Sequence, residues 1–168
     1  YYRIQATTLS DFSPLAPIDA FDYEGSSTLS AVKAVLSFDK LQSDNFGTRY
    51  KGYALQGSYE CAGGFLDADV DFSSATLSGW LYNCVKQTRS GHKHVLGLEA
   101  SVRLMVPFGD TRTVPVYERL FAGGPGTIRG FEYRRIGPHE RSYPTGGTFL
   151  AFANVEYSLP LPFQEDYF

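Results

Sequence analysis

The strongest constraint on the fold of this chain is a period of two in its apolar residues, rather than the period of 3.6 that marks a helix. Between His94 and Val106 every even position after His94 is apolar, whereas the odd positions include Glu99, Ser101 and Arg103. Successive side chains of a strand point to opposite faces of the sheet. The pattern therefore predicts one long β-strand with an apolar face and a polar face.

The same alternation, in places weaker, recurs along the whole chain. The predicted strands are 2–7, 32–38, 48–60, 66–82, 94–106 and 149–159. Several of these exceed the roughly 5–6 residues of an ordinary strand. The sequence thus predicts an all-β fold of about six antiparallel strands.

The connections between these strands are unequal in length. They are Ser10–Ser27, Asp39–Gly47, a tight hairpin turn at Ala62–Gly64, Val85–Gly91, and the long segment Phe108–Gly147. In an antiparallel sheet the first, third and fifth connections share one end, so the two longest lie together. Short turns at one end and long loops at the other are typical of outer-membrane barrels.

The two faces of the strands would then meet different surroundings. In a barrel, lipid contacts Leu96, Leu98, Val102 and Leu104, while Glu99 and Arg103 face a wet lumen. We expect four aromatic residues to contribute to the interfacial girdles: Trp80, Tyr82, Phe149 and Tyr157. A soluble antiparallel β-sandwich shows the same alternation and stays an alternative. Strand length and loop asymmetry favour the barrel.

Strand number and composition set further limits. A membrane barrel needs at least about eight strands, so about six strands would be a partial barrel, either a fragment or a wall completed by another chain. The formal net charge is −3, from 15 Lys+Arg against 18 Asp+Glu, which argues against a nucleic-acid binder. With 43% hydrophobic residues, the chain is not disordered by composition.

The most specific string lies in the long connection, Val114–Phe131. It reads Pro115, Tyr117, Glu118, Phe121, Gly123 and Gly124, followed by Ile128, Arg129, Gly130 and Phe131. Gly146 and Gly147 then precede a strand that carries Glu156 on its polar face. The combined pattern resembles the outer-membrane protein assembly factor family, the BamA-like barrels, whose long sixth extracellular loop carries a Val/Ile-Arg-Gly-Phe/Tyr motif.

The resemblance implies a fold and an activity. It implies a sixteen-stranded barrel preceded by periplasmic POTRA modules. Residues 1–168 would be a partial barrel, roughly the seventh to twelfth strands, with 108–147 folded into the lumen. We expect the POTRA modules and the closing strands to lie outside this chain. The implied activity is the folding and insertion of β-barrel proteins into the outer membrane, without nucleotide.

The resemblance also implies partners and a location. The partners would be the outer-membrane lipid bilayer, unfolded β-barrel client proteins and accessory lipoproteins of an assembly complex, and the location a bacterial outer membrane. A related translocation pore for protein secretion shares the barrel and the loop motif, and it stays an alternative function.

The loop motif implies an anchor. By resemblance, Arg129 pairs with Glu156, because its planar guanidinium suits a carboxylate. Gly130 would allow a tight turn beside Arg129, and Phe131 would pack the loop tip on the barrel wall. A single loop arginine is more often solvated, but the surrounding match favours the anchor.

Other candidate sites carry less weight. Gly123–Gly126 lacks the following Lys-Ser/Thr of a phosphate loop, and Asp67, Asp69 and Asp71 read as a solvated lumen face rather than a calcium site. Cys84, His92 and His94 are too few for a closed zinc site. Cys61 and Cys84 flank one long strand, and if that strand is continuous they lie too far apart for a disulfide, so their redox state stays open. We therefore expect no catalytic residues, metal or cofactor, and no enzyme.

Overall fold

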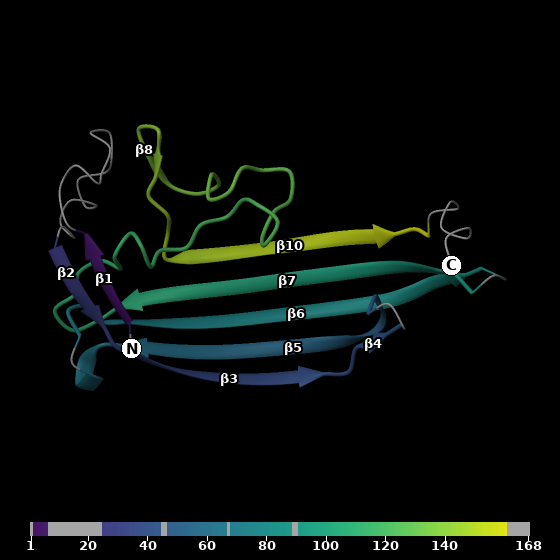
Figure 1. The fold of residues 1–168 in the computed structure, drawn as a ribbon, viewed down its shortest axis with the longest axis horizontal. Helices are drawn as coiled ribbons and strands as arrows, with labels where there is room; N and C mark the ends of the chain where they lie inside the picture. Colours follow the sequence, from purple (N-terminus) through teal and green to yellow (C-terminus); the bar gives the residue numbers. More distant parts are fainter. Residues whose placement is uncertain (1, 7–24, 45–46, 67, 89–90, 161–168) are drawn as a thin grey trace.

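One open antiparallel sheet dominates the chain. The computed structural model describes residues 2–6, 25–44, 47–66, 68–88 and 91–160. The sheet runs in the order β10-β7-β6-β5-β3, and the short β4 pairs with β5 beside β3 (Figure 1). Its strands are β3 (Ala31–Asp39), β4 (Gln42–Ser43), β5 (Arg49–Ala62), β6 (Phe72–Gln87), β7 (Lys93–Pro107) and β10 (Phe149–Ser158). The all-β, antiparallel fold class is confirmed, as a partial barrel wall that does not close.

The long strands follow the period-two pattern. β5, β6 and β7 contain 14, 16 and 15 residues, well beyond an ordinary strand. Antiparallel pairing joins β7 to β10 without a break, and to β6 with one shift of register between Cys84 and Lys86. Among the described residues, no helix is long and apolar enough to cross a membrane.

The start of the predicted strand 66–82 is wrong. Gly64–Leu66 forms a short 3-10 helix, η2, and β6 begins only at Phe72. The tight hairpin turn predicted at Ala62–Gly64 is therefore replaced by a connection of residues 63–71. Asp71 explains much of the difference, because its Oδ1 accepts a hydrogen bond from the Gly64 backbone nitrogen at 2.6 Å. Aspartate side chains often offer the backbone such alternatives to a sheet ladder.

The first predicted strand exists, but it does not join the main sheet. β1 (Tyr2–Ala6) pairs with β2 (Gly25–Leu29) in a separate two-stranded sheet. The first predicted connection, Ser10–Ser27, lies largely outside the described residues, and its last residues belong to β2. A second small sheet, β8 (His139–Glu140) with β9 (Tyr143–Pro144), lies inside the long connection.

The register confirms that the third and fifth predicted connections share one end of the sheet, whereas most of the first connection lies outside the described residues. The register brings together, at one end of the sheet, the start of β3, the end of β5, the start of β6, the end of β7 and the start of β10. The long connection between β7 and β10 leaves and returns at this end (Figure 1). The buried core lies here as well: Leu29, Ala62, Val70, Phe72, Met105, Val114 and Leu120. Burial of Val114 and Leu120 among these side chains packs the first part of the long connection against the sheet.

Candidate loop-anchoring site

The outer face of the sheet is apolar and exposed. Cross-strand pairing places Leu36, Gly57, Leu77, Val102 and Ala151 in one row across five strands. Leu36, Leu77 and Val102 are 82%, 55% and 45% exposed. The described residues place no second sheet over this face, so they do not form the β-sandwich that the sequence left open. A contiguous row of exposed apolar side chains across five strands is a feature of interaction or membrane surfaces.

Aromatic residues flank this apolar face at two levels. Phe149 and Tyr59 belong to one cross-strand row near the loop end of the sheet. Tyr53, Phe38 and Tyr157 lie nearer the other end, and the rings of Phe38 and Tyr53 are 5.8 Å apart. The row that holds Phe149 and the row that holds Tyr53 are six residues apart, roughly 20 Å along the strand.

The predicted places of Trp80 and Tyr82 are wrong. Both lie on the inner face, because Trp80 pairs opposite Glu99 and Tyr82 opposite Gly97. The indole Nε1 of Trp80 donates a hydrogen bond to Glu99 Oε1 at 3.1 Å. A Cβ atom on Gly97 would lie 2.9 Å from the Tyr82 ring, so that ring covers the glycine. Tyr59, Tyr53 and Phe38 hold the outward positions instead.

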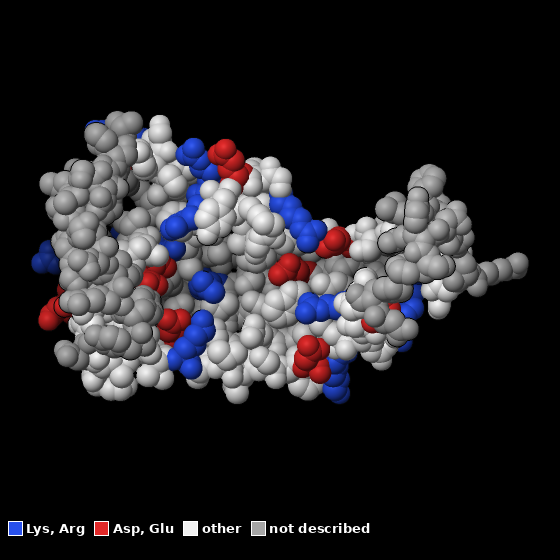
Figure 2. All heavy atoms as spheres, in the orientation of Figure 1, with Lys and Arg blue, Asp and Glu red and all other residues white. Residues whose placement is uncertain are grey.

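The inner face is polar and is partly covered by the long connection between β7 and β10, residues 108–148, here called the β7–β10 loop. Figure 2 shows acidic and basic side chains on the side of the molecule that faces the viewer. A cleft of about 510 Å³ separates the sheet from the loop. Its sheet side includes Thr76, Ser101 and Arg103, and its loop side includes Phe121 and Thr127.

Backbone hydrogen bonds give the loop a defined path over the sheet. Leu120 and Gly147 exchange backbone hydrogen bonds of 2.8 and 2.9 Å, which join the segment that leaves β7 to the segment that returns to β10. Ala122 pairs in the same way with Ile136. Arg119 adds donors to the carbonyl oxygens of Val114 and Thr145. A loop at the surface can satisfy its backbone groups with water. The hydrogen bonds within the β7–β10 loop instead make it a folded unit.

The residues that support the motif lie inside this folded unit. Pro115, Gly123, Gly124 and Gly146 are buried. Tyr117, Glu118, Phe121 and Gly147 are half-buried, and Tyr117, Glu118 and Phe121 all line the cleft. The motif therefore runs through the part of the loop that covers the polar face.

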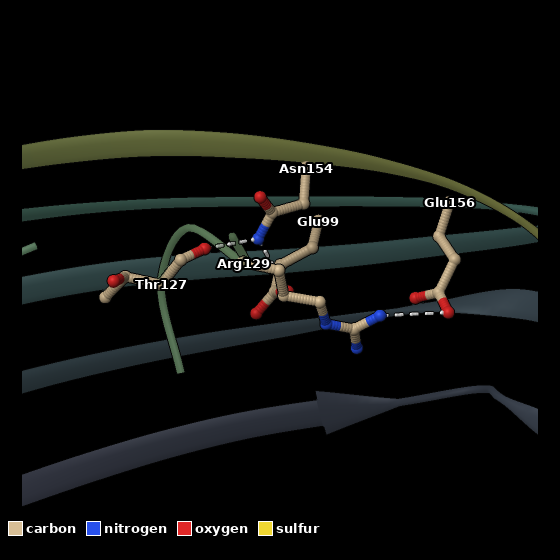
Figure 3. Close-up of polar contacts among 5 residues, drawn as sticks. All are labelled: Glu99, Thr127, Arg129, Asn154 and Glu156. Carbon is tan, nitrogen blue, oxygen red and sulfur yellow. Dashed lines mark hydrogen bonds and ion pairs between the residues drawn. The ribbon is translucent and has the colours of Figure 1, made fainter. Parts of the chain in front are cut away.

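Arg129 and Glu156 lie next to one another. Arg129 Nη1 is 3.2 Å from Glu156 Oε1, in a single contact rather than a bidentate one (Figure 3). Their side chains are 71% and 55% exposed. An exposed pair of this kind contributes about 0–1 kcal/mol and is screened by salt. Whether this contact anchors the loop in function stays a prediction.

The other three motif residues differ in their surroundings. Gly130 has a φ of 87°, a backbone conformation that favours glycine and turns the chain beside Arg129. Ile128 is half-buried. Phe131 is 58% exposed, and its predicted packing on the barrel wall stays a prediction.

Asn154 makes a second contact to the loop, which the sequence did not predict. The side-chain amide of Asn154 donates to the backbone carbonyl of Thr127 at 2.8 Å and to Glu99 Oε2 at 3.4 Å (Figure 3). Asn154 lies two residues before Glu156 on β10 and on the same face. The contacts involve half-buried groups, unlike those of Arg129. The sequence could have identified Asn154, because it is a polar residue two positions before Glu156 and therefore on the same face of the strand.

The remaining candidates do not form a site. Asp69 and Asp71 lie in the connection before β6 and accept backbone hydrogen bonds from Thr28 and Gly64, so they are not on a strand face. Asp67 is outside the described residues. Cys61 and Cys84 are free thiols at opposite ends of the sheet. Among the described residues, no group of three or more metal-binding side chains comes together.

A one-layer antiparallel wall, apolar outside and polar inside, with a long loop folded over its polar face, has the architecture of part of a β-barrel. Comparison with known families gives a match to the Omp85 superfamily domain over residues 1–168. The chain belongs to the Omp85 superfamily.

Curated relatives agree with this family. The chain is 29% identical to the outer membrane protein assembly factor BamA of Nitratidesulfovibrio vulgaris over 158 residues, 93% of this chain and 19% of that protein. It is 27% identical to a SAM50-like protein of Schizosaccharomyces pombe, over 94% of this chain and 32% of that protein. A 61-residue stretch is 36% identical to the sorting and assembly machinery component 50 homolog A of Xenopus laevis, covering 36% of this chain and 13% of that protein. The chain thus spans a third or less of each of these relatives.

Proposed function

We propose that this chain is part of the barrel wall of an outer-membrane assembly factor, which folds and inserts β-barrel proteins without nucleotide. The observation that carries the proposal is that the same sheet has an exposed apolar face and a polar face covered by a loop. The apolar face is exposed across five strands, and the polar face holds a loop whose Arg129 contacts Glu156. A lipid-facing wall and a lumenal loop account for both.

The names of the relatives support assembly rather than protein secretion, because they are an assembly factor and sorting-and-assembly components. These relatives come from a bacterium and from eukaryotes, so they favour an outer membrane without favouring a bacterial one. The proposed partners are the bilayer, unfolded β-barrel clients and the accessory subunits of an assembly complex.

In the proposed mechanism, this segment supplies the wall and the loop position rather than a reacting group. Clients would pair with an exposed strand edge elsewhere in the barrel, since an open edge presents unpaired backbone donors and acceptors. The β7–β10 loop, held against β10, would keep the lumen in the conformation in which that strand edge can receive clients. Residues 108–147 are on this proposal a lumenal loop.

The test replaces Arg129 in the full-length protein. Arg129→Glu places a carboxylate beside Glu156, so the contact becomes repulsive, and we expect strongly reduced complementation of a depleted strain. The charge-swapped protein with both Arg129→Glu and Glu156→Arg should recover part of the activity, because it restores an ion pair. The readout is the level of folded outer-membrane barrels at native expression.

A matched control distinguishes the contact from loss of a loop charge. Arg112→Glu makes the same charge change in the same loop, but Arg112 lies beside residues 68–71 at the end of the sheet. This variant should complement like the wild type. Normal complementation by Arg129→Glu would contradict the proposed role of the contact.

A further inference from the structure

We propose that Asn154, Glu99 and Trp80 form a second anchor, which holds the β7–β10 loop at Thr127 and thereby positions Arg129. The inference deepens the proposed function, because it takes the loop to be the lumenal loop of an assembly factor. It concerns residues of the wall that the loop motif does not contain.

Both hydrogens of the Asn154 amide nitrogen have an acceptor nearby. This nitrogen carries two hydrogens, and it faces two acceptors, the Thr127 carbonyl at 2.8 Å and Glu99 Oε2 at 3.4 Å. The flipped amide would turn its oxygen toward these same two oxygens, so the surroundings determine the orientation. One side chain of β10 thus joins the loop backbone to β7.

Glu99 is held in turn by the neighbouring strand. Its Oε1 accepts a hydrogen bond from Trp80 Nε1 at 3.1 Å, while its Oε2 accepts from Asn154. The three residues lie in a single cross-strand row of β6, β7 and β10. Because both carboxylate oxygens have a donor, the carboxylate cannot rotate without losing a hydrogen bond.

This network is better shielded than the ion pair. Trp80, Glu99 and Asn154 are half-buried, whereas the side chains of Arg129 and Glu156 are 71% and 55% exposed. Solvent screens exposed charges much more than half-buried ones. Thr127 precedes Arg129 by two residues, so fixing the Thr127 carbonyl limits where the guanidinium can reach. Trp80, Glu99 and Asn154 are therefore positioning residues.

A spin label beside Thr127 measures the anchor directly. Gly126 is exposed, its φ is not positive, and an added Cβ would meet nothing within 4 Å. The full-length protein, without its native cysteines and with Gly126→Cys carrying a nitroxide, is reconstituted in lipid nanodiscs. In Asn154→Ala and Asn154→Asp we expect the ratio of mobile to immobile label to rise about two- to tenfold, as for loss of one or two hydrogen bonds.

The two variants should differ in their response to pH. Asn154→Asp sets a carboxylate beside Glu99, and in acid one of the pair binds a proton and can donate again. The label should then become less mobile from about pH 8 to about pH 5 in Asn154→Asp and not in Asn154→Ala. Other charged side chains line this cleft or lie beside it, and they are the same in both variants: Arg103, Glu118, Arg119, Arg134, Arg129 and Glu156.

Two further variants complete the test. Trp80→Phe removes only the indole donor and should mobilise the label less than Asn154→Ala. Gln56→Glu is the matched control, because it converts an inner-face amide whose donor contact is Ser37 Oγ, on a strand remote from the loop. Unchanged label mobility in both Asn154 variants and Trp80→Phe, or equal mobilisation by Gln56→Glu, would overturn the anchor.

The outcome is independent of assembly activity. If the Asn154 variants mobilise the label but still complement normally, the second anchor is supported. The same result counts against the proposed role of loop position in assembly. An immobile label in every network variant, together with loss of complementation by Arg129→Glu, would leave the proposed function standing and refute the second anchor.

Discussion

At the scale of single residues, the loop depends on close contacts that exclude even a methyl group. Gly146 has a φ of 67°, and a Cβ at this position would lie 2.6 Å from Phe121 Cζ and 2.9 Å from Arg119 Cβ. The Phe121 ring also carries the Arg134 guanidinium, whose Cζ is 3.7 Å from the ring centroid. Gly146 therefore permits a stack of side chains that belong to the two sides of the loop.

This packing makes Gly146→Ala a test of the folded loop. The added methyl group meets side chains and a strained backbone, so we expect destabilisation of the loop by about 1–3 kcal/mol. The measurement is the rate of tryptic cleavage within residues 119–141 of the membrane-embedded full-length protein. Gly126→Ala, where the added methyl group has open space, should be cleaved at the wild-type rate. Equal rates for the two variants would show that Gly146 is not a packing constraint.

At the scale of the strands, each long element separates an apolar surface from a polar one. Leu77 lies in the central apolar row of β6, and Gln56 lies in the adjacent row on the polar face of β5. The two positions have similar places along the sheet but opposite orientations. The same substitution at Leu77 and at Gln56 can therefore report which face of the sheet contacts lipid.

A charge should be tolerated on only one of these faces. If the wall is embedded as proposed, Leu77→Arg should lower the free energy of unfolding in lipid vesicles by about 2–4 kcal/mol, the cost of an arginine near the bilayer midplane. Gln56→Arg should change it by much less, because that side chain reaches water. Urea titration followed by heat-modifiable gel migration measures both. A larger effect for Gln56→Arg would invert the proposed faces.

At the scale of the whole molecule, the sheet has two unpaired edges. β10 and β3 end the strand order, and each leaves a row of backbone donors and acceptors without a partner strand among the described elements. In a bilayer every such group costs several kcal/mol. Further strands, from the same polypeptide or from another chain, would remove that cost.

The open edges predict the behaviour of the isolated 168-residue segment. Refolded alone in detergent, it should associate through its edges or aggregate, because edge strands readily pair with other chains. Size-exclusion chromatography with light scattering measures the mass of the particle. A stable, folded monomer in lipid vesicles would contradict this reading of the edges.

The sequence alone determined most of the long strands of the main sheet, the end of the sheet that its connections share, and the resemblance to the family. Alternation is a local property, so it identified β7 and β10 almost to their ends, and the string around Arg129 identified the resemblance. The sequence also selected Glu156 as the candidate partner of Arg129. Local patterns failed at residues 66–71, where an aspartate side chain bonds the backbone and ends the alternation.

Only the tertiary structure decided which side chains meet across strands. Both faces of β6 carry large apolar residues, so residue type could not tell that Trp80 points inward. The pairing with β7 decides it, because a shift of one residue moves every side chain to the opposite face. The same register aligns Trp80, Glu99 and Asn154 in one row, in which Asn154 contacts Thr127. These contacts join residues that are far apart in the chain, and no local period records them.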